Sequence, residues 1–138
     1  MRPAAFTMLA LAVAAPLFSS RAADVILVIS DAEPDGRTVF AQLCTEAEFL
    51  KRCTLREKAA AHKDTLTISF KDVPPGAYAA TAFQDLNDNT KLDRGTFGAP
   101  SEPWAVSRGA KGFMGPPVFI DARVEVADKP LTLELELD

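Results

Sequence analysis

The stretch Thr65–Gln84, TLTISFKDVPPGAYAATAFQ, shows the alternation of apolar and polar residues that is typical of β-strands. In its first half, Leu66, Ile68 and Phe70 lie on one face, and threonine, serine and lysine lie on the other. The Pro-Pro-Gly sequence at 74–76 interrupts this alternation, as proline and glycine do in sharp turns. We therefore predict two antiparallel strands joined as a hairpin.

Other segments show related patterns. Residues 24–30 form a continuous apolar run, which predicts a central strand buried on both faces. Residues 38–44, 118–126 and 131–137 alternate, and a Lys-Pro turn separates the last two. Residues 45–61 are rich in Glu, Lys, Ala and Leu, and there we expect at most a short helical turn. Six or seven short strands predict an all-β fold, an antiparallel β-sandwich.

One long loop, residues 85–117, lacks a regular period and is rich in glycine and proline. Loops of this length are usually functional or disordered. Phe97, Trp104 and Phe113 provide apolar surface that can hold the loop against the rest of the domain, so we expect it to be ordered.

The N-terminal segment, residues 1–22, has the composition of a secretory signal peptide. Arg2 precedes an apolar run, and small residues stand where a cleavage site would precede Ala23. We expect a single exported domain, residues 23–138, in the periplasm or secreted, with no later segment that spans a membrane. This domain retains 13 basic and 19 acidic residues, a net charge of −6. Such a charge argues against nucleic-acid binding and is compatible with a cation.

The two cysteines, Cys44 and Cys53, are closely spaced in an exported chain, and we interpret them as a disulfide. Their spacing is not that of a C-x-x-C redox motif, and the single histidine, His62, has no second metal ligand beside it.

The segment FQDLNDNTKLDRGTFGAP, residues 83–100, carries oxygen donors at every second position, as calcium-binding loops do. The candidate metal ligands are Asp85, Asn87, Asn89, the carbonyl of Lys91, Asp93 and, from further along the chain, Glu102. With this small number of carboxylates we expect Ca²⁺ affinity to be weak.

Two positions depart from the calcium-loop pattern. Thr90 replaces the usual glycine, and Thr96 replaces the usual bidentate glutamate. The alternative interpretation is a cluster of Asx turns, in which Asp and Asn side chains accept hydrogen bonds from nearby backbone amides.

The only tryptophan, Trp104, stands in a loop together with Phe97, so these residues are the candidate ligand-binding platform. The competing interpretation is that Trp104 only anchors the loop to the core. We find no G-x-S-x-G sequence, no histidine pair and no Cys-His combination, so we do not expect an enzyme. A small hydrolase that uses the carboxylates of Asp93 and Glu102 is the remaining catalytic alternative.

The sequence from 74 to 126 resembles the bacterial exported family known as domain of unknown function 2141. The resemblance rests on three blocks: an N-x-N-G-K-L-D block matched by 87–93, an F-G-x-P-x-E block matched by 97–102, and a P-P-x-F-x-D-A block matched by 116–122. It implies a transthyretin-like or immunoglobulin-like β-sandwich and export, with no assigned activity. The chain departs from the family at Gln84, where histidine is expected, and at Thr90, where glycine is expected.

Three functional hypotheses follow from these features. The first is a non-catalytic exported domain whose 85–93 loop binds Ca²⁺ weakly and which presents a surface to a cell-envelope protein. The second is a carbohydrate- or peptide-binding module that uses Trp104 and the neighbouring loop aromatics. The third is the small hydrolase.

Overall fold

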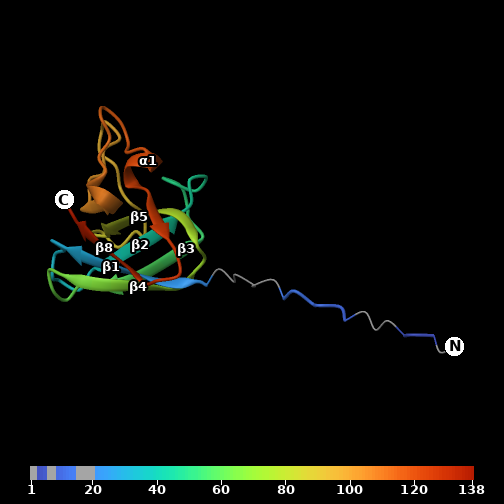
Figure 1. The fold of residues 1–138 in the computed structure, drawn as a ribbon. Coiled ribbons are helices and arrows are strands. Elements are labelled where there is room, and N and C mark those ends of the chain that lie inside the picture. The colour runs from blue at the N-terminus through green and yellow to red at the C-terminus, as the bar shows by residue number, and fades with distance from the viewer. Residues whose placement is uncertain (1–2, 6–8, 15–20) are drawn as a thin grey trace.

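A computed structural model describes residues 3–5, 9–14 and 21–138 (Figure 1). The predicted signal peptide, residues 1–22, includes all the positions outside these ranges, and its described side chains Leu9, Leu11 and Val13 are more than 80% exposed. Nothing in the described ranges forms a helix with the length and hydropathy required to cross a membrane.

Two β-sheets pack face to face, which confirms the predicted sandwich (Figure 1). The smaller sheet has the order β4-β1-β8, formed by β4 (Leu66–Val73), β1 (Ala23–Ser30) and β8 (Leu131–Glu136). The larger sheet has the order β3-β2-β5-β6, formed by β3 (Leu55–Ala60), β2 (Thr38–Cys44), β5 (Gly76–Gln84) and β6 (Trp104–Val106), and β7 (Val124–Val126) also pairs with β5. All pairs are antiparallel except β1 with β8, which is parallel.

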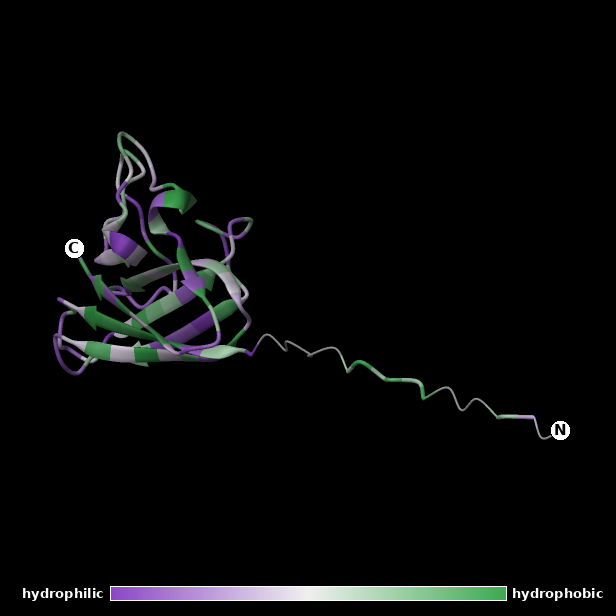
Figure 2. Cartoon of the chain, in the orientation of Figure 1, coloured by the Kyte–Doolittle hydropathy of each residue, from purple (hydrophilic) through white to green (hydrophobic). Residues whose placement is uncertain are grey.

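The core lies between the sheets because each strand buries every second side chain. Val25, Leu27 and Ile29 of β1 are fully buried, and they belong to one apolar cluster with residues of β2 and β5 such as Leu43 and Ala82. In Figure 2, bands of hydrophobic and less hydrophobic colour alternate along the front strand, β4.

The predicted hairpin between residues 65–71 and 77–84 is wrong. Strand β4 pairs with β1, whereas β5 pairs with β2, so the Pro-Pro-Gly sequence carries the chain from one sheet to the other. The two prolines have no amide hydrogen to donate to a hairpin ladder. The carbonyl of Pro74 instead accepts a 2.8 Å hydrogen bond from the hydroxyl of Tyr78.

Other predicted elements also need correction. Strand β1 is central in its sheet, as predicted, but only one of its faces is fully buried. Residues 118–126 are not one strand, because Phe119–Ala122 form a short helix, α1, and only β7 is extended. Strand β3 was not predicted, since its sequence LREKAA lies at an edge and lacks apolar alternation. The long loop contains β6 and the 3₁₀ helix η1 (Ser107–Gly109). Of the aromatic residues expected to hold it against the domain, Trp104 packs on an apolar cluster, whereas Phe97 and Phe113 are 98% and 93% exposed.

A buried serine joins three of these elements. Ser107, in η1, has no exposed surface. Its hydroxyl oxygen accepts a 3.0 Å hydrogen bond from the amide of Ala80 in β5, and the hydroxyl donates to the carbonyl of Ala122 in α1. The long loop and α1 are thereby attached to the edge of β5, between the residues that pair with β6 and those that pair with β7.

Replacement of this serine should destabilise the protein. In Ser107→Ala the amide of Ala80 and the carbonyl of Ala122 would be left buried without their partner, at a cost of about 1–3 kcal/mol. Urea unfolding of the oxidised protein would measure the loss in the free energy of unfolding. Ser101→Ala is the control, because Ser101 is exposed. Equal stability of the two variants would contradict this role of Ser107.

Candidate functional site

An aromatic row crosses the outer face of the larger sheet. Phe40 of β2 lies directly opposite Phe83 of β5, and Phe83 lies opposite Trp104 of β6. Residues directly opposite in antiparallel strands share a face, so these three side chains point away from the core. The rings of Phe40 and Phe83 stack with their centroids 5.4 Å apart.

A groove with a volume of about 1090 Å³ lies over part of this row. Its floor includes Phe83, Trp104 and Val106, which come from β5 and β6. Its sides come from three loops, residues 50–52, 91–100 and 111–117. Phe97 and Met114, at the tips of two of these loops, are 98% and 94% exposed. The groove therefore presents apolar surface that the fold leaves open to a ligand.

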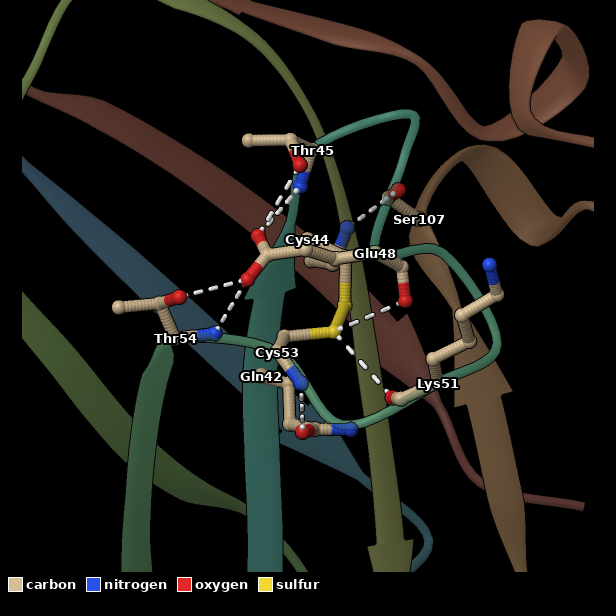
Figure 3. Close-up of a disulfide and its surroundings, with 9 residues drawn as sticks. Gln42, Cys44, Thr45, Glu48, Lys51, Cys53, Thr54 and Ser107 are labelled. Atoms are coloured by element: carbon tan, nitrogen blue, oxygen red, sulfur yellow. Dashed lines mark hydrogen bonds between the residues drawn. A yellow bond between two sulfur atoms is a disulfide. The ribbon is translucent and has the colours of Figure 1, made fainter.

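The first side of the groove is held in place by the predicted disulfide. Cys44, at the end of β2, is bonded to Cys53, with 5.1 Å between their Cα atoms (Figure 3). The loop that this bond closes carries Lys51 and Arg52 to the groove. The amide of Cys53 also donates a 2.9 Å hydrogen bond to the side-chain oxygen of Gln42.

The carboxylate of Glu48 joins the two ends of the same loop by hydrogen bonds. Figure 3 shows it between Thr45 and Thr54, and it accepts hydrogen bonds from the amide and the hydroxyl of both. These bonds, with that from the Thr54 hydroxyl first, lower the pKa of Glu48 from 4.5 to about 2. The charged carboxylate is therefore part of the folded loop at neutral pH.

The second side of the groove is held by a buried carboxylate. Glu102 is only 6% exposed, and its two oxygens accept hydrogen bonds from the amides of Leu86 and Asp93, at 2.6 Å and 2.9 Å. These amides lie at the two ends of the 85–93 loop. Glu102 thus holds the two ends of this loop at a fixed separation. Lys91 and Leu92 of the loop line the groove.

The Asp and Asn residues of the 85–93 loop come together in a small cluster. Asp85 is buried, and its carboxylate accepts the amide hydrogens of Asn89 and Thr90. The side-chain amides of Asn87 and Asn89 donate to the carboxylate of Asp93. These bonds, with those from Asn89 first, lower the pKa of Asp93 below its usual value.

Two further observations bear on a cation at this cluster. Among the described residues, no three side chains of His, Cys, Asp or Glu are grouped as a metal site. Thr90, however, has φ of 64°, so it adopts the left-handed conformation for which calcium loops usually use glycine. The loop therefore follows a tight path around Asp85 despite the β-branched side chain.

The structure brings some of the sequence-predicted residues together and separates others. Trp104 and Phe97 line the same groove, whereas the exposed Phe113 is not part of its lining. Glu102 contacts backbone amides, and Gln84 points to a different loop, where it pairs with both backbone groups of Glu33. Sequence reasoning missed the basic residues of the groove and the role of Glu48. Lys51 and Arg52 directly precede Cys53 in the sequence. Because the disulfide fixes the position of Cys53, this adjacency could have indicated that the two basic side chains are held in place on the surface.

The stabilising effect of Glu48 should depend on pH. The pKa of this carboxyl is lower in the folded protein than in the unfolded chain, so its contribution is present above about pH 4.5. It is lost as the pH falls from about 4.5 to about 2. The melting temperature of the wild type should exceed that of Glu48→Gln at pH 7, and the difference should disappear near pH 2. Glu46→Gln, an exposed position in the same loop, is the control. A difference that stays constant with pH would contradict the assignment.

Comparison with known proteins places the chain in a family. Residues 27–134 match the model of a family described as an uncharacterized protein conserved in bacteria, DUF2141. The match begins within β1 and ends within β8, and it includes the 85–93 loop and every residue that lines the groove except Asp138. Searches of the curated proteins and of the solved structures found no significant match. The resemblance predicted from residues 74–126 is thus confirmed, and the chain belongs to the bacterial family DUF2141.

Proposed function

We propose that this chain is an exported, non-catalytic binding domain, and that its groove beside Trp104 receives a polypeptide segment of a cell-envelope protein. The observation that carries the proposal is the position of Trp104. It lies at the end of an outward-facing aromatic row and on the floor of a groove large enough for several side chains.

The chemistry of the groove favours a peptide over a saccharide. Saccharide hydroxyl groups donate as well as accept hydrogen bonds, so a saccharide site needs acceptor side chains in addition to donors and an aromatic platform. Here the side-chain oxygen of Gln42 is already bonded to the amide of Cys53, and the carboxylate of Asp138 is bonded to Lys111. Most other lining residues are apolar or basic, and they include Met114, a side chain that adapts to varied apolar partners.

Two features support an exported protein. The N-terminal 22 residues have the composition of a signal peptide. The disulfide between Cys44 and Cys53 is of the kind that persists in oxidising compartments such as the periplasm.

Binding, rather than catalysis, also agrees with the residues that line the groove. They include no histidine, serine or cysteine that could act as a nucleophile or a base. Asp93 and Glu102, the carboxylates considered for a hydrolase, are engaged in hydrogen bonds that hold the loop.

The proposal predicts that peptide binding requires the groove. A displayed library of random peptides, selected on the purified protein, should yield binders that lose affinity for Phe97→Ala and Trp104→Ala. Phe113→Ala is the matched control, because Phe113 is 93% exposed but lies outside the groove lining. Loss of a buried apolar anchor should weaken binding by about 1–3 kcal/mol. Binders that distinguish none of these variants from wild type, or the absence of binders, would contradict the proposal.

A second candidate function is weak Ca²⁺ binding by the 85–93 loop. The left-handed conformation of Thr90 and the convergence of Asn87, Asn89 and Asp93 favour it. Rotation of the two side-chain amides by 180° would turn their oxygens, in place of their nitrogens, toward the carboxylate of Asp93. It would break the hydrogen bonds that these oxygens now accept from the backbone amides of Asn89 and Lys91, so the ion would have to replace them. The ligands would then be oxygen atoms, as Ca²⁺ requires, and the ion would stabilise the loop that forms one side of the groove.

This candidate function predicts thermal stabilisation by Ca²⁺. The melting temperature of the chelator-treated protein should rise saturably in a titration to tens of millimolar Ca²⁺, and Mg²⁺ should act more weakly. Ligand at 100 times its Kd adds about 2.7 kcal/mol, a shift of several degrees. Asp93→Asn should remove the Ca²⁺-dependent shift, whereas Asp88→Asn, at an exposed position in the same loop, should retain it. No shift in wild type would mean that the loop is an Asx-turn cluster alone.

A further inference from the structure

The groove is basic, although the chain as a whole is acidic. Five of its lining residues are cationic and one, Asp138, is anionic, whereas the formal net charge of the chain is −4. The cationic residues are Lys51, Arg52, Lys91, Arg94 and Lys111. Positive charge of this density in an acidic protein marks a surface for a negatively charged partner.

Most of these cationic side chains form no ion pair within the described part of the chain. Lys111 forms an ion pair with Asp138 at 2.6 Å, and Arg94 donates to the carbonyl of Gly98. Lys51, Arg52 and Lys91 are exposed and take part in none of the ion pairs found among the described residues.

The basic character continues along the outer face of the sheet. Lys58 of β3 lies directly opposite Phe40, and Arg56 lies opposite Gln42. A row of side chains therefore runs from Lys58 through Phe40 and Phe83 to Trp104. Two cationic side chains of the edge strand therefore lie on the same face of the sheet as the aromatic row.

We propose that the occupant of the groove is an acidic amphipathic polypeptide segment, in which Asp or Glu residues are interspersed with apolar anchors. This inference rests on the proposed function and specifies its ligand. The apolar anchors would contact Phe83, Trp104 and Phe97, and the carboxylates would meet the basic side chains above them.

The distribution of the charges is the reason for a polypeptide. The cationic residues come from three separate loops, at 51–52, 91–94 and 111, around an apolar floor. A ligand with a single anionic head, such as a fatty acid, would satisfy one of these loops only. A chain with several carboxylates can satisfy all three while its apolar side chains cover the floor.

The shape of the site disfavours an anionic membrane surface. The basic residues line a concave groove, which a flat bilayer cannot enter but an extended chain can. The exposed Phe97 and Met114 lie on the loops that border the groove, where their apolar side chains can contact an inserted segment.

The composition of selected peptides tests the inference. Peptides from the display library that depend on Phe97 should be enriched in Asp and Glu, together with aromatic or aliphatic residues, relative to the unselected library. Affinity of one synthesised peptide, measured by calorimetry or by the fluorescence of the single tryptophan, should fall as NaCl rises from about 0.05 to about 0.5 M.

Charge reversal supplies matched variants. Lys51→Glu combined with Arg52→Glu should weaken this peptide at least about tenfold at low salt, and Lys91→Glu should weaken it as well. Lys63→Glu combined with Lys129→Glu makes the same change in net charge at exposed positions outside the groove, and it should leave binding unchanged within about twofold.

The possible outcomes separate this inference from the proposed function. Peptides that need Phe97 but are neutral or basic, or that tolerate charge reversal, would overturn the inference and leave a peptide-binding groove. Absence of any Phe97-dependent peptide would overturn both. Preferential binding to phosphatidylglycerol vesicles, or a dimer in sedimentation that Lys51→Glu with Arg52→Glu dissociates, would replace the acidic segment by a lipid surface or a second copy.

Discussion

The packing of β1 against the larger sheet is the constraint on which the rest of the structure depends. Val25, Leu27 and Ile29 have no exposed surface, and the residues that they share a core with on β2 and β5 include the small side chains Ala41 and Ala80. Side chains alternate between the two faces along each strand, so Phe40 and Phe83, which stand between core positions of β2 and β5, lie on the opposite face. The aromatic row, and the groove above it, follow from this division.

Polar contacts and a small apolar cluster together hold the sides of the groove. In this cluster Phe49 of the first loop and Phe119 of α1 pack with Val106, Ala110 and Trp104. Glu48 and the disulfide hold the first loop, Glu102 spans the second, and Ser107 attaches the segment that leads to the third. Carboxylates that accept backbone amides bind more strongly than neutral acceptors do. The fold can therefore keep apolar tips such as Phe97 exposed on loops whose bases are fixed, an arrangement that suits a binding surface.

The distribution of charge gives this surface a preference for anionic ligands. Acidic residues predominate in the chain, and basic residues are concentrated around the groove. A cationic groove with apolar walls strengthens the field that an anionic ligand meets, and the acidic remainder repels that ligand from other faces. The hydrogen-bonded carboxylates of Asp93 and Glu102 lie close to the groove without lining it, so they support the loop and leave the lining basic.

The sequence by itself indicated strands at 24–30, 38–44, 65–71, 77–84 and 131–137, which form β1, β2, β4, β5 and β8, and it indicated the disulfide, because each depends on residues close together in the chain. A two-residue period indicates which side chains of a strand share a face, but it does not indicate which other strand lies beside that strand in the sheet. Only the tertiary structure therefore decided that 74–76 joins two sheets and that β8 lies parallel to β1. The groove also required the tertiary structure, since its basic residues come from loops up to 60 positions apart and meet only when the sandwich closes.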